Sequence, residues 1–358
     1  MILCLCREEH DWKMIPAYAD AFRSHGVDLF CVNDSIPFDA SLEEVLRTCP
    51  NIPSAIFYFE SAHSLFPTGL ERSEIPTVCF HPDTYAFTDR RIRWSAVFDH
   101  AVVFHPGYRE RFARAGHPGA LLLPHAVRRR RAFFEGAEWA REFDVGWVGQ
   151  TGGPWYKSRA EWLPKLAAEF RMNDWRQRFT LEETAAIYRR SRIVVNIGRD
   201  DFPQDANLRV FEVLASGALL ITSLPSELTQ LGFQTGVHFV GYRDPSDLIG
   251  IVRRYLADET ARSKIADAAR SLALSEHTYD RRAEQLLAHL ANAGQTRLAP
   301  ARNWSEPRAR LVALDFYASR GLTSCAAAQL RKIAGHGVRE TIEGASLLSR
   351  SWIKSFIR

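Results

Sequence analysis

The sequence predicts an α/β protein with two doubly wound parallel sheets facing a cleft, followed by a helical extension. In the first third of the chain, short apolar strand-like segments alternate with helix-like segments, as in a parallel sheet with helices on both faces. The same alternation begins again after a polar, arginine-rich stretch. We therefore expect a first domain over residues 1–135, a second over 136–294 and a helical extension over 295–358.

The individual elements follow from the positions of the apolar residues. In the first domain we expect strands over 1–6, 27–32, 54–59, 77–81, 101–105 and 121–123, and helices over 12–25, 42–48 and 108–115. In the second we expect strands over 143–148, 193–197 and 218–222, and helices over 158–170, 181–190, 207–216, 245–256, 258–272 and 279–293.

The extension is expected to form short basic helices over 308–317, 326–333 and 341–358. We favour packing of the last helix onto the first domain, with partner contact or peripheral contact with an anionic membrane as alternatives. The arginine run at 128–131 is interpreted as a solvated linker rather than a phosphate patch.

The composition is that of a soluble enzyme. The chain has 358 residues, 46% of them hydrophobic, and a formal net charge of +4. This mild basicity favours anionic ligands without indicating nucleic acid. The six cysteines show no zinc spacing, so we expect buried thiols in a reducing compartment. No segment resembles a signal peptide or a membrane span, and we predict a cytoplasmic protein.

The stretch 207–222 is the most informative part of the chain. Asn207 is a suitable N-cap for a helix, and Gly217 is the expected residue just after the helix end. Residues 218–222 then form an uninterrupted apolar run, typical of a buried parallel strand. Arg209 and Glu212 lie on one face of this helix. We predict that the helix start binds phosphate and that the Glu212 carboxylate binds ribose hydroxyls, with a surface ion pair as the alternative for Glu212.

Further candidate phosphate-binding residues surround a glycine-rich turn over 149–153. Because this turn lies between a strand and a helix, its backbone N–H groups could bind phosphate, although a plain tight turn is about as consistent with the pattern. We name three residues of the turn, two cations just after it and one arginine after the next strand: Gly149, Gln150, Thr151, Lys157, Arg159 and Arg199.

Candidate acid–base residues lie at the end of the strand at 77–81 and just after it. Asp83 is a candidate general base for a substrate hydroxyl, and a turn-forming aspartate after Pro82 is the alternative. His81 is the second candidate, since histidine titrates near neutrality. His10 is a third residue that we expect only to contact the substrate.

At this point the chain resembles a known family. The run from Glu212 to Ile221 is similar to the nucleotide-sugar helix of GT-B glycosyltransferases, in which the glutamate holds the donor ribose. Several blocks in order resemble the bacterial spore-maturation-type group, over about residues 54–290: Asp83-Thr84, Phe98–Phe104, Leu121–Pro124, Phe143–Gly149, Asn207-x-Arg209-x-Phe211-Glu212 and His277-Thr278-Tyr279-x-x-Arg282. Where the retaining enzymes carry a first glutamate, this chain has Gln204.

The resemblance implies a GT-B fold with two Rossmann-like domains. It also implies transfer of a sugar from a nucleoside-diphosphate sugar to a hydroxyl of a glycan, a lipid-linked glycan or a protein. Neither a cofactor nor a metal is expected, since basic side chains and a helix N-terminus can neutralise the leaving diphosphate. A nucleotide-sugar epimerase or hydrolase of the same shape, and a non-catalytic nucleotide-sugar-binding protein, are the alternatives.

Overall fold

A computed structural model describes residues 1–7, 14–128, 140–294, 296–336 and 338–356, with the side chains of 350–356 left out. The chain divides into two compact units, residues 1–123 with 286–358 (unit 1) and residues 124–285 (unit 2). Residues 286–358, which include the helical extension expected over 295–358, cluster with the first unit. Most of the arginine run lies outside the described residues.

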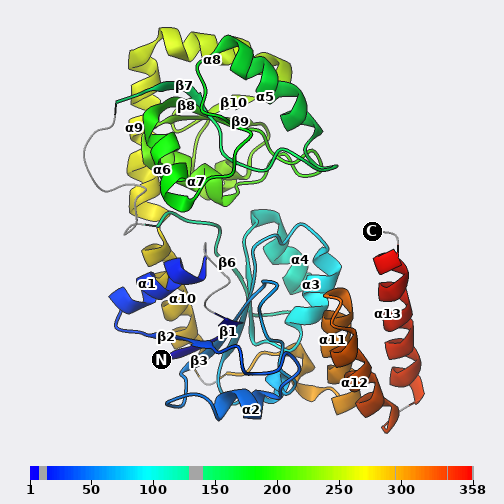
Figure 1. Ribbon diagram of the computed structural model, residues 1–358. Helices are drawn as coiled ribbons and strands as arrows, with labels where there is room; N and C mark the ends of the chain where they lie inside the picture. Colours follow the sequence, from blue (N-terminus) through cyan, green and yellow to red (C-terminus); the bar gives the residue numbers. More distant parts are fainter. Residues whose placement is uncertain (8–13, 129–139, 295, 337, 357–358) are drawn as a thin grey trace. The chain divides into compact units, whose positions relative to one another are not determined.

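Unit 1 is built on a six-stranded parallel sheet with the order β2-β1-β3-β4-β5-β6 (Figure 1). Its strands are β1 Ile2–Arg7, β2 Leu29–Val32, β3 Ala55–Phe59, β4 Thr77–His81, β5 His100–Val103 and β6 Ala120–Leu122. Between them run the helices α1 Ile15–Ser24, α2 Leu42–Leu46, α3 Thr88–Ser95 and α4 Arg109–Arg114. The alternation of strands and helices is as expected, except that no helix was predicted at the position of α3.

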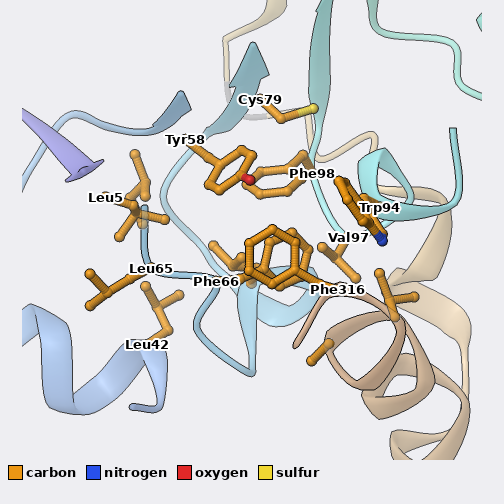
Figure 2. Packing of buried hydrophobic residues seen from close by; sticks show 14 of the residues in the cluster. Leu5, Leu42, Tyr58, Leu65, Phe66, Cys79, Trp94, Val97, Phe98 and Phe316 are labelled. Atoms are coloured by element: carbon orange, nitrogen blue, oxygen red, sulfur yellow. The ribbon is translucent and has the colours of Figure 1, made fainter. Parts of the chain in front are cut away.

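The C-terminal helices α11 Glu306–Ser319, α12 Thr323–Ala334 and α13 Val338–Phe356 belong to unit 1. Phe316 of α11 stacks on Phe66 with ring centroids 4.5 Å apart and meets Tyr58 of β3 edge-on (Figure 2). The Tyr317 hydroxyl donates to the Phe66 carbonyl at 2.7 Å. In α13, Leu347 and Leu348 pack against a cluster formed by α11 and α12, and Leu348 also packs against the main core cluster of unit 1.

Unit 2 contains a four-stranded parallel sheet with the order β10-β9-β8-β7. The strands are β7 Phe143–Gly146, β8 Ser191–Asn196, β9 Leu219–Ser223 and β10 Val240–Tyr242. The helices are α5 Lys157–Glu169, α6 Leu181–Arg190, α7 Leu208–Ser216, α8 Leu248–Ala257 and α9 Glu259–Glu276, and α10 Tyr279–Ala293 leads back to unit 1. The very short β10 was not predicted.

Both faces of the central strands β8 and β9 are covered, which explains the apolar runs 193–195 and 219–221. On β8, Ile193 and Val195 belong to one buried cluster, and Val194 between them belongs to the other. On β9, Leu219 and Ile221 likewise lie in the first cluster and Leu220 in the second.

The block from His277 to Arg282 has a clear structural role. The Val127 amide donates to the His277 carbonyl at 2.8 Å, and the Tyr279 amide donates to the Val127 carbonyl at 3.0 Å. The Arg282 guanidinium donates to the Pro124 carbonyl at 3.1 Å and to His277 Nδ1 at 2.9 Å. This block, which is part of the resemblance described above, therefore joins residues 124–127 at the start of unit 2 to the junction of α9 and α10.

None of the helices in the described part of the chain is both long enough and apolar enough to cross a bilayer. All six cysteines are free thiols, three buried and three half-buried.

The end of α7 gives a test of the local structure. Gly217 has a φ of 75°, a left-handed conformation that costs an L-residue free energy, and a Cβ there would lie 3.3 Å from the Arg141 guanidinium. We expect Gly217→Ala to lower the free energy of unfolding by about 1 kcal/mol in urea titrations. Gly250→Ala is the matched control, because Gly250 is an exposed residue inside α8 with open space at its Cβ. It should leave stability unchanged or raise it by up to about 1 kcal/mol; equal effects of the two changes would contradict this account.

Candidate functional site

The first turn of α7 carries an arginine that is held by neutral groups. Arg209 Nη1 donates to Asn196 Oδ1 at 2.8 Å, and its guanidinium lies 4.7 Å from the centroid of the Trp147 ring. Asn196 is itself buried at the end of β8 and donates to Thr222 Oγ1 on β9. The carboxyl ends of two neighbouring strands therefore orient the guanidinium of Arg209.

A second guanidinium, that of Arg159 on α5, lies beside the same indole. It is 5.3 Å from the Trp147 centroid and 4.2 Å from that of Tyr156. Its Nε donates to the Ile197 carbonyl and its Nη1 to the Gln150 carbonyl, both at 2.8 Å. Burial lowers the pKa of Arg159 to about 10, and repulsion from Arg209 adds to this effect, so the group stays protonated at neutral pH. In the described part of the chain neither guanidinium forms an ion pair, which leaves two neighbouring positive charges for an anion to neutralise.

Glu212 lies one turn along α7 from Arg209 and is only 8% exposed. Burial and the Glu212 charge raise the pKa of the neighbouring Tyr188 hydroxyl well above its usual value. The predicted cap at the start of this helix is wrong in one respect. The Asn207 side chain makes no capping hydrogen bond, and its buried Oδ1 has no hydrogen-bond partner among the described residues.

The turn over 149–153 lies against this basic pair. A Cβ at Gly149 would fall 2.3 Å from Arg209 Nη2, so a side chain there would displace the guanidinium from its present position. Gln150 is exposed and its amide donates to the Gly152 carbonyl at 3.1 Å, while Thr151 is half-buried.

The N-terminus of α5 already holds an anion from the chain itself. The backbone amides of Lys157 and Ser158 donate to the Asp200 carboxylate at 2.7 and 3.2 Å. Burial raises the pKa of Asp200, but the hydrogen bonds from Ser158 and from both amides outweigh it and lower the pKa below its usual value. This argues against phosphate binding at these two amides; the exposed Lys157 side chain remains able to reach a ligand.

Arg199 pairs with a neighbour on the loop after β8. Its Nε and Nη2 donate to the two carboxylate oxygens of Asp201, both at 2.8 Å. Its guanidinium lies 5.2 Å from the centroid of the half-exposed Trp155 ring. The structure thus brings Arg159 and Arg209 together with Gly149, whereas Arg199 has a carboxylate partner of its own.

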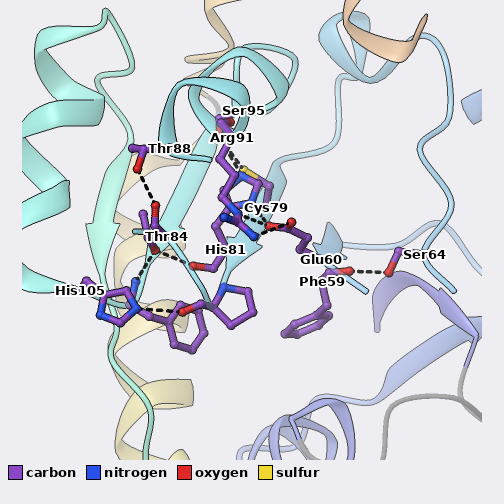
Figure 3. Close-up of polar contacts among 12 residues, drawn as sticks. Phe59, Glu60, Ser64, Cys79, His81, Thr84, Thr88, Arg91, Ser95 and His105 are labelled. Atoms are coloured by element: carbon purple, nitrogen blue, oxygen red, sulfur yellow. Dashed lines mark hydrogen bonds and ion pairs between the residues drawn. The ribbon is translucent and has the colours of Figure 1, made fainter. Parts of the chain in front are cut away.

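In unit 1, Asp83 is exposed on the turn between β4 and α3. The buried Thr84 side chain fixes this turn through two hydrogen bonds of its hydroxyl group (Figure 3). Its Oγ1 donates to the His81 carbonyl at 2.6 Å and accepts from the Phe104 amide at 3.1 Å. His105 Nε2 lies 3.1 Å from the Pro82 carbonyl oxygen. The turn that presents Asp83 to solvent is therefore tied to the ends of both β4 and β5.

His81 lies in the core and is poorly suited to act as a base. It is 0% exposed, and its Nδ1 and Nε2 lie 2.8 Å from Glu60 Oε2 and 2.9 Å from Ser95 Oγ. Burial lowers its pKa below the ordinary value in spite of the Glu60 carboxylate. Because both ring nitrogens are occupied inside the protein, the structure argues against our second assignment of a general base. His10 lies outside the described residues.

Sequence reasoning missed the carboxylate next to His81. Glu60 follows β3 directly and accepts hydrogen bonds from Arg91 Nε and Nη2 at 2.6 and 2.9 Å (Figure 3). Burial raises the pKa of Glu60, but His81 and Arg91 outweigh it and lower the pKa to about 2. A charged residue at the carboxyl end of an apolar strand was the available signal.

Comparison with known proteins links this geometry to a class of enzyme. Residues 128–288, a little under half of the chain, match the family model described as "Glycosyl transferase-like". The match covers almost all of unit 2, including the residues around Trp147 and the whole of α7. A comparison with curated proteins finds no match.

Solved structures extend the likeness to both units. HepE of Anabaena, in complex with UDP and glucose, is 13% identical with a TM-score of 0.56, over 81% of this chain and 99% of that one. A glycosyltransferase from Rickettsia africae is 10% identical with a TM-score of 0.56, over 80% and 96%. The sucrose-phosphate synthase of Thermosynechococcus elongatus is 14% identical with a TM-score of 0.52, over 82% and 99%. The predicted GT-B fold with two Rossmann-like sheets is confirmed, and the glycosyltransferase resemblance holds for unit 2.

The cap of α5 can be tested directly. Asp200→Ala removes the acceptor of two backbone amides at the start of this 13-residue helix, and we expect a loss of about 1 kcal/mol in the free energy of unfolding. Asp201→Ala is the control, since its carboxylate pairs with Arg199 near the surface and should contribute less than about 0.5 kcal/mol. Chemical denaturation of both variants gives the comparison, and an equal or smaller loss for Asp200→Ala would contradict the capping role.

Proposed function

We propose that the chain transfers a glycosyl group from a nucleoside-diphosphate sugar to a hydroxyl acceptor, and that unit 2 binds the donor. The observation that carries this proposal is the pair of guanidinium groups of Arg159 and Arg209 on the Trp147 indole. Both bind only neutral oxygens in the described part of the chain, and they repel each other. A diphosphate would relieve this repulsion and accept hydrogen bonds from both groups.

The same pair accounts for the chemistry of the leaving group. Glycosyl transfer breaks the bond between the anomeric carbon and the diphosphate oxygen, and negative charge grows on the diphosphate as this bond breaks. Guanidinium groups fixed beforehand stabilise that charge without reorganisation. The bonds from Arg159 to two carbonyls and from Arg209 to Asn196 supply this fixation. On this proposal the reaction uses neither a metal nor a cofactor.

Glu212 is proposed to bind the donor ribose. A buried carboxylate on α7, one turn from Arg209, offers two acceptors to a pair of vicinal hydroxyls. HepE was crystallised with UDP and with UDP-glucose, so uridine nucleotides stand first among the donors to be tested here. Gly149, Gln150, Thr151 and Lys157 are proposed to contact the same ligand, and Asn207 offers an unpartnered oxygen at the helix start.

Asp83 is proposed as the general base that takes the proton of the acceptor hydroxyl. Its support is positional: an exposed carboxylate at the carboxyl end of a parallel strand, on a turn fixed by Thr84. Ligands of open α/β sheets bind at this edge. The acceptor is proposed to be a glycan, a lipid-linked glycan or a protein. Membership of the spore-maturation-type group, a cytoplasmic location and peripheral contact through 341–358 are further parts of the proposal. No observation favours the epimerase, hydrolase or non-catalytic alternatives.

The donor site is tested by binding. We expect Glu212→Ala to weaken nucleotide-sugar binding by about 1.5–3 kcal/mol, because it removes a charged hydrogen-bonding partner. Glu212→Gln keeps the volume and serves where the alanine variant does not fold. Arg209→Gln should lose a similar amount, while Arg253→Gln, which breaks an ion pair with Glu169 on the surface of α8, should bind normally. A thermal-shift titration with UDP, GDP, dTDP and CMP sugars measures all four; unchanged donor affinity in folded Glu212 and Arg209 variants would refute the site.

The chemical step is tested by Asp83→Asn. The asparagine keeps the size of the side chain but cannot take a proton, so transfer should fall by roughly two to four orders of magnitude with donor binding nearly intact. Asp89→Asn is the control, since Asp89 is an exposed carboxylate on α3 that pairs with Arg111. Turnover of the donor with an acceptor panel is the measurement, repeated with chelator. Near-full activity of Asp83→Asn would remove the base assignment, and activity that chelator abolishes and manganese restores would overturn the metal-free reaction.

A further inference from the structure

A pocket of about 820 Å³ lies in unit 1 between α2, the segment 66–75 and α11. Its volume is in the range of sites that bind small organic molecules. Part of its lining, Leu42, Phe66 and Val97, is visible in Figure 2. Nothing in the donor or acceptor chemistry proposed above uses this pocket.

The pocket lies at the amino ends of the strands, and Asp83 lies at their carboxyl ends. Two of its lining residues, Ile75 and Val97, come just before the first residues of β4 and β5. Asp83, in contrast, follows the last residue of β4. Since β4 has five residues and a strand rises about 3.3 Å per residue, roughly 16 Å separate the two ends. This distance makes the pocket a site separate from the acceptor turn.

The floor of the pocket is apolar and its rim is charged. Leu42, Leu46 and Ala313 contribute apolar surface, and the small residues of α11 leave room above it. The rim carries four glutamates and three arginines: Glu43, Glu71, Glu74, Glu306, Arg47, Arg72 and Arg310. Each of these arginines pairs with a glutamate of the rim. The rim is thus nearly neutral overall, yet dense in hydrogen-bond donors and acceptors.

Glu71 is the least satisfied of these groups. Its side chain is only 7% exposed, and its one ion pair in the described part of the chain is a contact of 3.4 Å with Arg72, whose own side chain is 57% exposed. A carboxylate this deeply buried normally receives several hydrogen bonds. Glu71 therefore offers acceptor capacity to a ligand that brings hydroxyl or N–H donors into the pocket.

We propose that this pocket binds a saccharide. A sugar ring presents an apolar C–H face to such a floor and hydroxyl groups to the rim, where each hydroxyl donates to a glutamate and accepts from an arginine. A ligand with a net charge would gain little from a rim of balanced charge. Glu71 accepts from a hydroxyl of the sugar, and the enzyme thereby holds a carbohydrate at a place remote from the transfer reaction.

Saturation-transfer NMR on the full chain tests this, with D-glucose, N-acetyl-D-glucosamine and maltotriose as probes and saturating UDP present to fill the donor site. We expect signal from at least one saccharide. Leu46→Trp, which adds volume at a half-buried wall position, and Glu71→Gln should each weaken binding about tenfold or more. Glu110→Gln on α4 is the matched control with an exposed carboxylate, and Asp83→Asn shows whether the acceptor turn contributes to the signal.

The outcomes separate this site from the donor site. Saccharide binding that survives in folded Leu46→Trp and Glu71→Gln, or that disappears in Asp83→Asn alone, would overturn the proposal. The absence of saccharide signal at millimolar concentrations would also overturn it. So would a signal from n-butylammonium where the sugars give none, because the pocket would then bind an apolar cation and not a saccharide. UDP affinity should be the same in all four variants, so a failure of UDP binding would count against the proposed function and leave the saccharide result readable.

Discussion

The two guanidinium groups that lie beside the Trp147 indole are the constraint on which the arrangement of unit 2 depends. Arg159 comes from α5 and Arg209 from α7, and the Trp147 indole beside both of them comes directly after β7. Bringing two cations together costs free energy, which the neighbouring carbonyls and the Asn196 amide only partly offset. Burial, together with repulsion from Arg209, lowers the pKa of Arg159 to about 10. In the described part of the chain neither guanidinium forms an ion pair, so the pair is suited to an anionic ligand, and the glycine at 149 leaves room for the Arg209 guanidinium.

Much of this could be predicted from the sequence, and the reasons for the exceptions are specific. Apolar runs such as 191–196 and 219–223 are buried on both faces, so they were recognised as strands with nearly the observed bounds. The helix α3 was missed because its sequence TDRRIRWS has few apolar residues, and β10 because it has only three residues with a central glycine. These elements are stabilised by their neighbours more than by their own periodicity.

The site residues show the same distinction. Arg209, Glu212 and Gly149 could be named as candidates from the sequence because a strand, a turn and a helix place them locally. The partner of the α5 amides, Asp200, lies about forty residues farther along the chain, and no local pattern links it to Lys157. His81 was placed correctly at a strand end, but its burial depends on Glu60 and Arg91, which approach from other segments. Tertiary contacts of this kind decide which polar group at a sheet edge is available to a ligand.

The C-terminal helices also stabilise unit 1, because α11 completes its hydrophobic core. Phe316 covers Phe66 and Tyr58, and Asp315 accepts from the buried Trp94 indole at 3.1 Å. Just after this helix, Arg320 lies 3.5 Å from the Glu60 carboxylate, which also receives Arg91 and His81. The charge network around Glu60 therefore includes Arg320, which comes from the C-terminal part of the chain. The C-terminal segment, which lies outside the resemblance at 54–290, thus contacts the carboxyl end of the unit 1 sheet, where the acceptor chemistry is proposed.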